Sequence, residues 1–256
     1  MALFVRALAS ATVASLTVVA AMTTSALADG PKTWSGIYLG GQAGFGFGKG
    51  DALQTGTTQG FANAVGTQLP GFSPGGGFWG GQIGVQQQIG SFVYGVETTL
   101  AGTRFASNKA DPNTAQGVQD RLSVKQIGTL VGRIGYGTSD WMAYAKGGYA
   151  YGTTNFSSIC PPPACVPVVA VEPHNNHGGY ALGAGVDWRL KGNWTLGLDY
   201  TFAHLNASQA TLQPTTNGVP FATPETWRTN ANVNMVGLRL NYQFGRESAP
   251  TPAPLK

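Results

Sequence analysis

The chain has 256 residues and a formal net charge of +4. Charged residues make up only 10% of it, against roughly 25% in soluble globular domains, while glycine is abundant, with 38 residues. The positive charge is small and scattered, which excludes the dense basic surface of a nucleic-acid-binding protein, so no nucleic-acid partner is expected.

The first 28 residues have the pattern of an export signal. Arg6 gives a positively charged start, an uncharged apolar stretch follows, and the segment ends in Ala26-Leu27-Ala28, a small-residue cleavage pattern. We therefore predict that residues 1–28 are a secretory signal peptide, the alternative being an uncleaved membrane helix. After residue 28 no stretch approaches the ~20 apolar residues that a spanning helix needs, so the mature chain is expected to be exported without a helical membrane span.

The rest of the chain contains segments in which apolar and polar residues alternate. A period of two marks a strand whose two faces meet different surroundings. In the first segment, 35–48, Leu39 and Phe45 share one parity, and Tyr38 and Gln42 share the other. Seven more segments follow, at 78–89, 92–102, 124–136, 141–152, 180–190, 193–202 and 234–244. Each is about as long as the 9–11 residues of a tilted membrane strand, or longer.

The connections between these segments alternate in length. The short ones are turn-forming, at 90–91, 138–140 and 191–193. The long ones fall near 49–77, 103–123, 153–178 and 205–231. Short turns at one end and long polar loops at the other are typical of a transmembrane β-barrel whose long loops are extracellular. The aromatic residues near the short turns are expected to form an interfacial girdle: Phe92, Tyr136, Trp141, Trp188, Trp194 and Phe244.

We therefore predict a single all-β domain over residues 29–245, an eight-stranded antiparallel transmembrane β-barrel. The apolar parity of each strand is expected to face lipid and the charged parity to face the lumen. Residues 246–256 are rich in proline and are expected to form a flexible, extended tail without a core to join.

Several of these segments, taken in order, resemble the α-proteobacterial outer-membrane surface antigens of the Brucella and rhizobial type. They are TWSGIYLGGQAGFGFG (33–48), GTLVGRIGYGTSDWMAYAKGGYAYG (128–152), GGYALGAGVDW (178–188), NWTLGLDYTF (193–202) and VGLRLNYQF (236–244). The resemblance implies an eight-stranded barrel in the outer membrane of a Gram-negative bacterium, with a porin-like or immunogenic surface role and no catalytic residues to carry over.

The chain departs from that family at its end. The family usually stops at the terminal Phe, whereas Phe244 is followed here by GRESAPTPAPLK. Tyr242 and Phe244 complete the last predicted strand, so we expect the barrel-assembly machinery to recognise them as an internal assembly signal.

Charged side chains of the lumen parity are the first candidate site: Glu97, Arg133, Lys146, Asp187, Asp199 and Arg239, with Lys125 and Arg189 at strand ends. Aligning the strand ends places Glu97 opposite Arg133. The same alignment places Asp199 opposite Arg239 and Lys146 diagonal to Asp187. These charges are either a permeation path or a structural ion-pair network. The narrow interior of an eight-stranded barrel favours the network.

The long connections hold the remaining candidates. Cys160 and Cys165 lie in an exported chain, which predicts a disulfide bond between them. His174 and His177 with Glu172 are a candidate metal site, but without a third firm ligand a solvated loop is favoured, and no metal or cofactor is expected. His204 lies near Ser208, and some lipid-modifying barrels hold a His/Ser pair at this height.

We therefore expect a protein that is not an enzyme and that contributes to envelope integrity and, through its loops, to surface interactions. A narrow porin-like channel for small solutes is the alternative, and a lipid-modifying barrel built around His204 is the second alternative. The expected partners are outer-membrane lipid and lipopolysaccharide, the barrel-assembly machinery and extracellular ligands of the loops, with the oligomeric state left open.

Overall fold

The structure is a computed structural model that describes residues 33–56, 65–110, 119–160, 168–216, 219–220 and 225–244. The predicted signal peptide and the predicted tail lie outside the described residues. Within the described ranges, no helix is long and apolar enough to cross a membrane.

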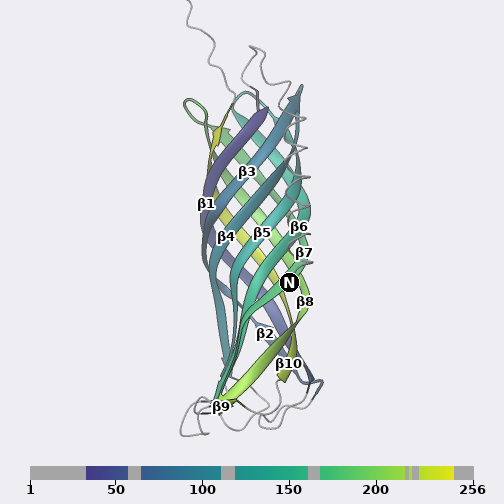
Figure 1. Ribbon diagram of the computed structural model, residues 1–256. Helices are drawn as coiled ribbons and strands as arrows, with labels where there is room; N and C mark the ends of the chain where they lie inside the picture. The colour runs from purple at the N-terminus through teal and green to yellow at the C-terminus, as the bar shows by residue number, and fades with distance from the viewer. Residues whose placement is uncertain are drawn as a thin grey trace, which may run out of the picture.

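Ten antiparallel strands form one closed sheet (Figure 1). Eight are long: β1 (Gly36–Gly56), β3 (Gly75–Ile89), β4 (Phe92–Ala110), β5 (Gln119–Gly137), β6 (Trp141–Cys160), β7 (Val168–Arg189), β8 (Trp194–Thr216) and β10 (Glu225–Gln243). Two are short: β2 (Gln68–Phe72), which pairs with β1, and β9 (Val219–Pro220), which pairs with β8. The long strands pair in chain order, and β10 pairs with both β8 and β1. The predicted eight-stranded antiparallel barrel is confirmed.

The paired strands are staggered around the ring. Following directly paired residues once around the barrel from Lys49 on β1 leads back to β1 at Leu39, which is ten positions earlier. Such a stagger accompanies strands that tilt against the barrel axis. A barrel of eight strands has an interior just wide enough for side chains to fill it, so the inward-facing residues decide what the lumen contains.

The barrel has a short-turn end, where β3–β4, β5–β6 and β7–β8 connect, and a long-loop end, near β2 and β9 in Figure 1. Over the half next to the short turns, the side chains follow the predicted parity. Leu39 is 52% exposed and Phe45 is 77% exposed, whereas Glu97 is fully buried in the lumen. Outward-facing apolar residues and inward-facing polar residues are the arrangement that surrounding lipid requires.

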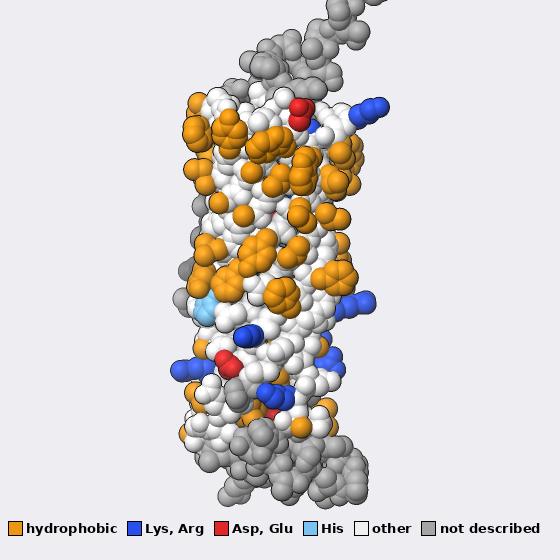
Figure 2. Space-filling view, turned by 180° about the vertical axis from the view of Figure 1, so that it is seen from behind, with side chains coloured by type: hydrophobic (Ala, Val, Ile, Leu, Met, Phe, Trp, Pro, Cys, Tyr) orange, Lys and Arg blue, Asp and Glu red, His pale blue; other side chains and the backbone are white. Residues whose placement is uncertain are grey.

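Aromatic residues mark both borders of this apolar band. The six predicted girdle residues are all exposed, and some of their rings touch, with centroids 6.4 Å apart for Phe92 and Tyr136 and 6.3 Å apart for Tyr136 and Trp141. A second set of exposed aromatic side chains lies further along the strands: Phe47, Trp79, Tyr149, Tyr151 and Tyr180. Figure 2 shows hydrophobic side chains over this half of the barrel, and Lys and Arg side chains beyond them.

In their described parts, the four segments predicted as long loops are largely continuations of the strands, so the predicted bounds of these loops were wrong. β8, for example, runs to Thr216, well past its predicted end at Phe202. In these continuations the alternation is reversed: apolar side chains face inward and are buried, among them Ala52, Phe105, Phe156, Leu212 and Trp227. Where water replaces lipid outside the barrel, burial of apolar surface favours an apolar interior. The polar outer parity explains why no strand was predicted there.

The last strand ends against the first. The Phe244 N–H donates to the Ile37 carbonyl oxygen at 2.8 Å, and the Phe244 and Tyr242 rings lie 5.1 Å apart on the outer face. These contacts complete the pairing of β10 with β1, the seam that closes the ring.

We expect Phe244→Ala to lower the amount of protein in the membrane several-fold, because it removes the last side chain at this seam, whereas deletion of residues 246–256 leaves the amount unchanged. Immunoblots of outer-membrane fractions measure this. Leu240→Ala, at another lipid-facing position of β10, is the matched control. Loss of membrane protein on deletion of the tail, with Phe244→Ala tolerated, would show that the tail carries the assembly signal.

Candidate functional site

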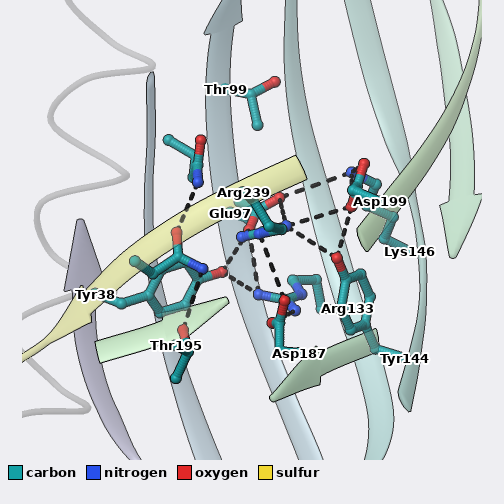
Figure 3. A network of polar contacts seen from close by, with 12 residues as sticks. Tyr38, Glu97, Thr99, Arg133, Tyr144, Lys146, Asp187, Thr195, Asp199 and Arg239 are labelled. Carbon is teal, nitrogen blue, oxygen red and sulfur yellow. Dashed lines mark hydrogen bonds and ion pairs between the residues drawn. The ribbon is translucent and has the colours of Figure 1, made fainter. Parts of the chain in front are cut away.

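Six charged side chains meet inside the barrel, one from each of six strands (Figure 3). They are Glu97 on β4, Arg133 on β5, Lys146 on β6, Asp187 on β7, Asp199 on β8 and Arg239 on β10. All six are at most 6% exposed. Three carboxylates balance three cations, so the set is formally neutral. We call these six residues the lumen network; the structure brings together all six of the lumen charges predicted as a network.

Glu97 lies at the centre of the lumen network, because its carboxylate contacts all three cations. Arg133 Nη1 lies 3.1 Å from Glu97 Oε2, and Lys146 Nζ lies 3.8 Å from Glu97 Oε1. Arg239 Nη2 donates to Glu97 Oε2. A carboxylate buried this deeply is stable in ionised form only with such partners.

The other two carboxylates each join two cations. Lys146 Nζ lies 2.7 Å from Asp199 Oδ2, and Arg239 Nη1 lies 3.3 Å from Asp199 Oδ1. Arg133 Nη2 lies 3.0 Å from Asp187 Oδ2, and Arg239 Nε lies 3.7 Å from Asp187 Oδ1. Every cation of the network therefore has at least two carboxylate neighbours, and the six groups form one connected cluster across the lumen.

Two tyrosines that the sequence analysis did not single out complete the cluster. The Tyr38 hydroxyl, from β1, donates to Glu97 Oε2 at 2.7 Å, and the Tyr144 hydroxyl, from β6, donates to Asp199 Oδ1 at 2.6 Å. The Arg133 guanidinium lies 3.8 Å from the centre of the Tyr144 ring, a distance that allows a cation–π interaction. Each tyrosine lies on the inward parity of its strand, which is the sequence signal that would have identified it.

The predicted cross-strand register was wrong by two residues. Arg133 is paired with Gly95 rather than with Glu97, and Arg239 is paired with Gly197 rather than with Asp199. The carboxylates are reached diagonally. Because Gly197 has no side chain, the Arg239 side chain and the Asp187 carboxylate can both occupy the space above it, where a Cβ atom would collide with them.

The predicted placement of Lys146 diagonal to Asp187 was also wrong. On β7 the residue paired with Lys146 is Gly183, while Asp187 pairs with Met142, further toward the short turns. Since Gly183 presents no side chain, the Lys146 side chain passes over β7 and reaches Asp199 on β8. Two strands that are not neighbours in the sheet are thereby linked through the lumen.

Of the two other predicted lumen charges, Arg189 has a buried guanidinium outside the lumen network, whereas Lys125 does not face the lumen. Lys125 is exposed on the outer surface, at a bulge where the pairing of β5 with β6 skips from Val124 to Gln126. Such an extra residue shifts the inward and outward parity of the strand. Arg189 lies at the short-turn end, with its guanidinium 4.3 Å from the centre of the Trp34 ring.

On the long-loop side of the lumen network, apolar side chains fill the lumen. One buried cluster contains Phe78, Phe105 and Leu205, and a second, nearer the loops, contains Phe156 and Trp227. The Phe78 and Phe105 rings meet edge to face, with centroids 6.5 Å apart, and the Phe156 and Trp227 centroids are 5.3 Å apart. In the described part of the chain, the lumen therefore holds the charged lumen network and, on its long-loop side, two layers of apolar side chains.

On the short-turn side of the lumen network, the lumen opens into a small hollow. The residues that line it are Trp34, Tyr38, Gln86, Arg133, Asp187, Thr195, Asn241 and Gln243. Its polar lining suits water. The hollow reaches Arg133 and Asp187, where the lumen network begins.

His204 and Ser208, the pair considered for lipid chemistry, have different partners. His204 Nδ1 lies 2.5 Å from Asn232 Oδ1, and its ring lies against Tyr180, an exposed residue of the outer face. The Ser208 hydroxyl donates to Asn175 Oδ1 at 2.9 Å. A serine nucleophile needs a base within hydrogen-bond distance of its hydroxyl. Neither of these contacts provides one for Ser208.

The candidate metal site has no support in the described residues. His177 faces inward on the long-loop side of Tyr180, where its ring nitrogens contact the Thr154 hydroxyl at 2.7 Å and the Asn206 carbonyl oxygen at 2.9 Å. Burial lowers the pKa of His177. The side chains of His174 and Glu172 lie outside the described residues. Among those described, no three His, Cys, Asp or Glu side chains are grouped to hold a metal.

The predicted disulfide bond between Cys160 and Cys165 also falls on side chains outside the described residues, so it remains a prediction. We expect the exported protein to take up no alkylating reagent before reduction and two equivalents after it, as intact-protein mass spectrometry measures. Cys160→Ser is the control, since it leaves Cys165 with a thiol that is alkylated without reduction. Alkylation of both cysteines in the unreduced protein would refute the bond.

The chain is similar to several known outer-membrane proteins. A family model described as outer membrane protein beta-barrel domain matches residues 12–244. The 31 kDa outer-membrane immunogenic protein of Brucella melitensis biotype 1 is 26% identical over 215 residues, which cover 83% of this chain and 84% of that protein. The 22 kDa outer membrane protein of Rhizobium leguminosarum bv. viciae is 28% identical over 170 residues, covering 66% and 64%. The crystal structure of OprG from Pseudomonas aeruginosa, 15% identical, covers 84% of this chain and 98% of that chain with a TM-score of 0.49.

Proposed function

The chain belongs to the outer membrane protein β-barrel domain family, and we propose that it is a structural and surface protein with a closed lumen. In this role the barrel contributes to the integrity of the outer membrane, and its long-loop end extends beyond the lipid into the surroundings of the cell. The predicted Brucella and rhizobial resemblance is confirmed, and it supports a place in the bacterial outer membrane.

The filled lumen is the observation that carries this proposal. Arg133 and Asp187, on the short-turn side of the lumen network, are paired at 3.0 Å. Beyond them lies the fully buried ring of Phe105. A narrow porin-like channel needs a continuous water-filled path, so the packed interior supports the scaffold over the channel.

The neutral lumen network explains how a barrel can be closed by charges. Each buried charge would be very costly alone, but three carboxylates and three cations in mutual contact compensate one another. Because the contacts join strands that are not neighbours, such as β4 with β10 through Glu97 and Arg239, the network cross-links the ring from inside. A rigid closed cylinder suits a structural role in a membrane.

The continued strands support a surface role. They raise the loops above the lipid, with polar side chains outside and the Phe156 and Trp227 cluster inside. Connecting segments held in this way are where binding residues of many proteins lie. We propose that the loop tips contact extracellular ligands.

The experiment that tests the structural role is deletion of the protein in its own host. We expect the deletion strain to take up more of a hydrophobic fluorescent dye and to survive less well in detergent than the parent. The full chain and a variant with shortened loop tips should both restore the barrier, because the barrel and not the tips is responsible for it. A deletion strain with an unchanged barrier would contradict the proposed role.

A further inference from the structure

Three basic side chains stand on the outer surface just beyond the lipid-facing aromatic band. They are Lys49 on β1, Arg104 on β4 and Lys125 on β5, and all three are exposed. The stagger of ten residues is spread over eight strands. From one strand to the next, the residue at the same height along the barrel axis is therefore about one position away from the directly paired residue. With that correction, the three side chains lie at about the same height, where lipid gives way to water.

A bulge places two of these cations side by side. Between β4 and β5 the pairing skips from Gly102 opposite Gln126 to Phe105 opposite Val124, which leaves Arg104 and Lys125 next to each other outside the regular ladder. The Thr103 hydroxyl donates to the Val124 carbonyl oxygen at 2.7 Å and fixes the irregular backbone. Bulges commonly re-aim side chains at functional positions.

The Arg104 guanidinium is held over an aromatic ring. It lies 5.2 Å from the centre of the Trp79 ring, and Trp79 is 52% exposed on the lipid face. Tryptophan prefers the membrane interface, so the stack keeps the guanidinium at headgroup level. Its planar face is occupied by the ring, while its edge donors remain free to bind an oxyanion in bidentate geometry.

Below the cations the wall of the barrel is bare. The outward positions of β3 next to Phe45 and Phe47 are Gly77 and Gly75. A Cβ atom placed at Gly77 would meet only the Gly44 carbonyl oxygen, at 3.8 Å. The result is a strip of outer wall without side chains, which we call the Gly75–Gly77 trough, next to the exposed Phe45, Phe47 and Trp79 rings. These apolar surroundings suit a hydrocarbon chain.

These cations differ from those of the lumen. Every cation of the lumen network is paired, whereas within the described residues no carboxylate lies within ion-pair distance of Lys49, Arg104 or Lys125. Asp51 is the nearby acidic residue on the outer face of β1, and its Oδ1 accepts the Gly71 N–H at 3.2 Å. The surface therefore presents excess positive charge at headgroup level.

We propose that Arg104 and Lys125, assisted by Lys49, bind a phosphate of the phosphorylated glycolipid of the outer leaflet, with one acyl chain lying in the Gly75–Gly77 trough. Charge-assisted hydrogen bonds from an arginine and a lysine suit a phosphate monoester, and basic clusters at the membrane border are typical of anionic lipid recognition. This site lies on the outer wall and does not depend on whether the lumen is closed.

Native mass spectrometry of the detergent-purified full chain with lipid A tests the site. We expect the triple variant Lys49→Gln, Arg104→Gln, Lys125→Gln to lose affinity for lipid A by roughly tenfold or more, since each phosphate contact is a charge-assisted hydrogen bond. The control Arg121→Gln, Lys191→Gln, Arg228→Gln removes the same charge from exposed positions elsewhere and should change the affinity by less than about threefold. The migration of unboiled protein in gels checks that all variants fold, and Arg104→Gln alone replaces the triple variant if the latter does not.

Two further arms separate phosphate recognition from general lipid adhesion. Lipid A stripped of its phosphates should bind the wild-type chain as weakly as intact lipid A binds the triple variant. Gly77→Leu, which fills the trough and keeps the cations, should weaken lipid A binding without changing binding of inorganic phosphate. Equal loss in the triple variant and its control, or equal binding of stripped and intact lipid A, would overturn the site.

Discussion

Replacing Arg239 with methionine is expected to destabilise the barrel by about 3–5 kcal/mol, the usual cost of removing one partner from a buried ion pair. Arg239 touches all three carboxylates of the lumen network, at Glu97, Asp187 and Asp199. Its loss leaves an unbalanced negative charge in a packed lumen. Adding Glu97→Gln restores neutrality, so the double variant should be more stable than Arg239→Met alone. Adding Asp199→Leu instead should also recover part of the loss.

Urea unfolding of the refolded variants from detergent measures these differences. Lys191→Met, at an exposed turn, is the matched control and should change the free energy of unfolding by less than about 0.5 kcal/mol. Additive effects of Arg239→Met and Glu97→Gln would mean that the two groups are not partners. Polar groups that line the hollow near Arg133 and Asp187 reduce the penalty, so recovery is expected to be partial rather than complete.

Replacing Phe105 with alanine is expected to cost about 3–5 kcal/mol as well, for a different reason. The Phe105 ring is fully buried, packs against Phe78 and covers Gly46, where a Cβ atom would collide with it. Its removal leaves a cavity that the surrounding strands cannot collapse to fill. The same unfolding experiment measures the change.

The matched control for Phe105→Ala is Phe92→Ala in the lipid-facing girdle. Phe92 is 66% exposed on the outer surface, and lipid flows into the space that its ring leaves, so no cavity forms and the loss should be clearly smaller. If both substitutions cost the same, the long-loop half of the barrel is not packed as the structure places it.

The part of the fold within the lipid was predictable from sequence, because lipid imposes a strict alternation. Leu39 and Phe45 had to face outward, and Glu97, Asp199 and Arg239 had to face inward, for one physical reason: an isolated charge cannot be exposed to hydrocarbon. The six charges of the lumen network followed from this parity alone. The sequence therefore predicted the strands within the lipid and the members of the lumen network, but not their detailed geometry.

The part of the fold beyond the lipid was not predictable in the same way. There the outer face is polar and the inner face apolar, so β8 beyond Phe202 looked like a loop. The bulge at Lys125 shifts the parity of β5, which moved that side chain from the predicted lumen position to the outer surface. The diagonal register and the reach of Lys146 over Gly183 depend on strand tilt and side-chain length, neither of which the alternation encodes.

Conductance of the refolded full chain in a planar lipid bilayer shows whether the lumen is closed. We expect insertion without stepwise current, under conditions in which a general porin run in parallel gives regular steps. We also expect that Arg239→Met, despite its lower stability, shows no ion-selective current. Reproducible unitary steps from the wild-type chain, with an ion selectivity that changes in Arg239→Met, would contradict the closed lumen and establish a conducting path through the network.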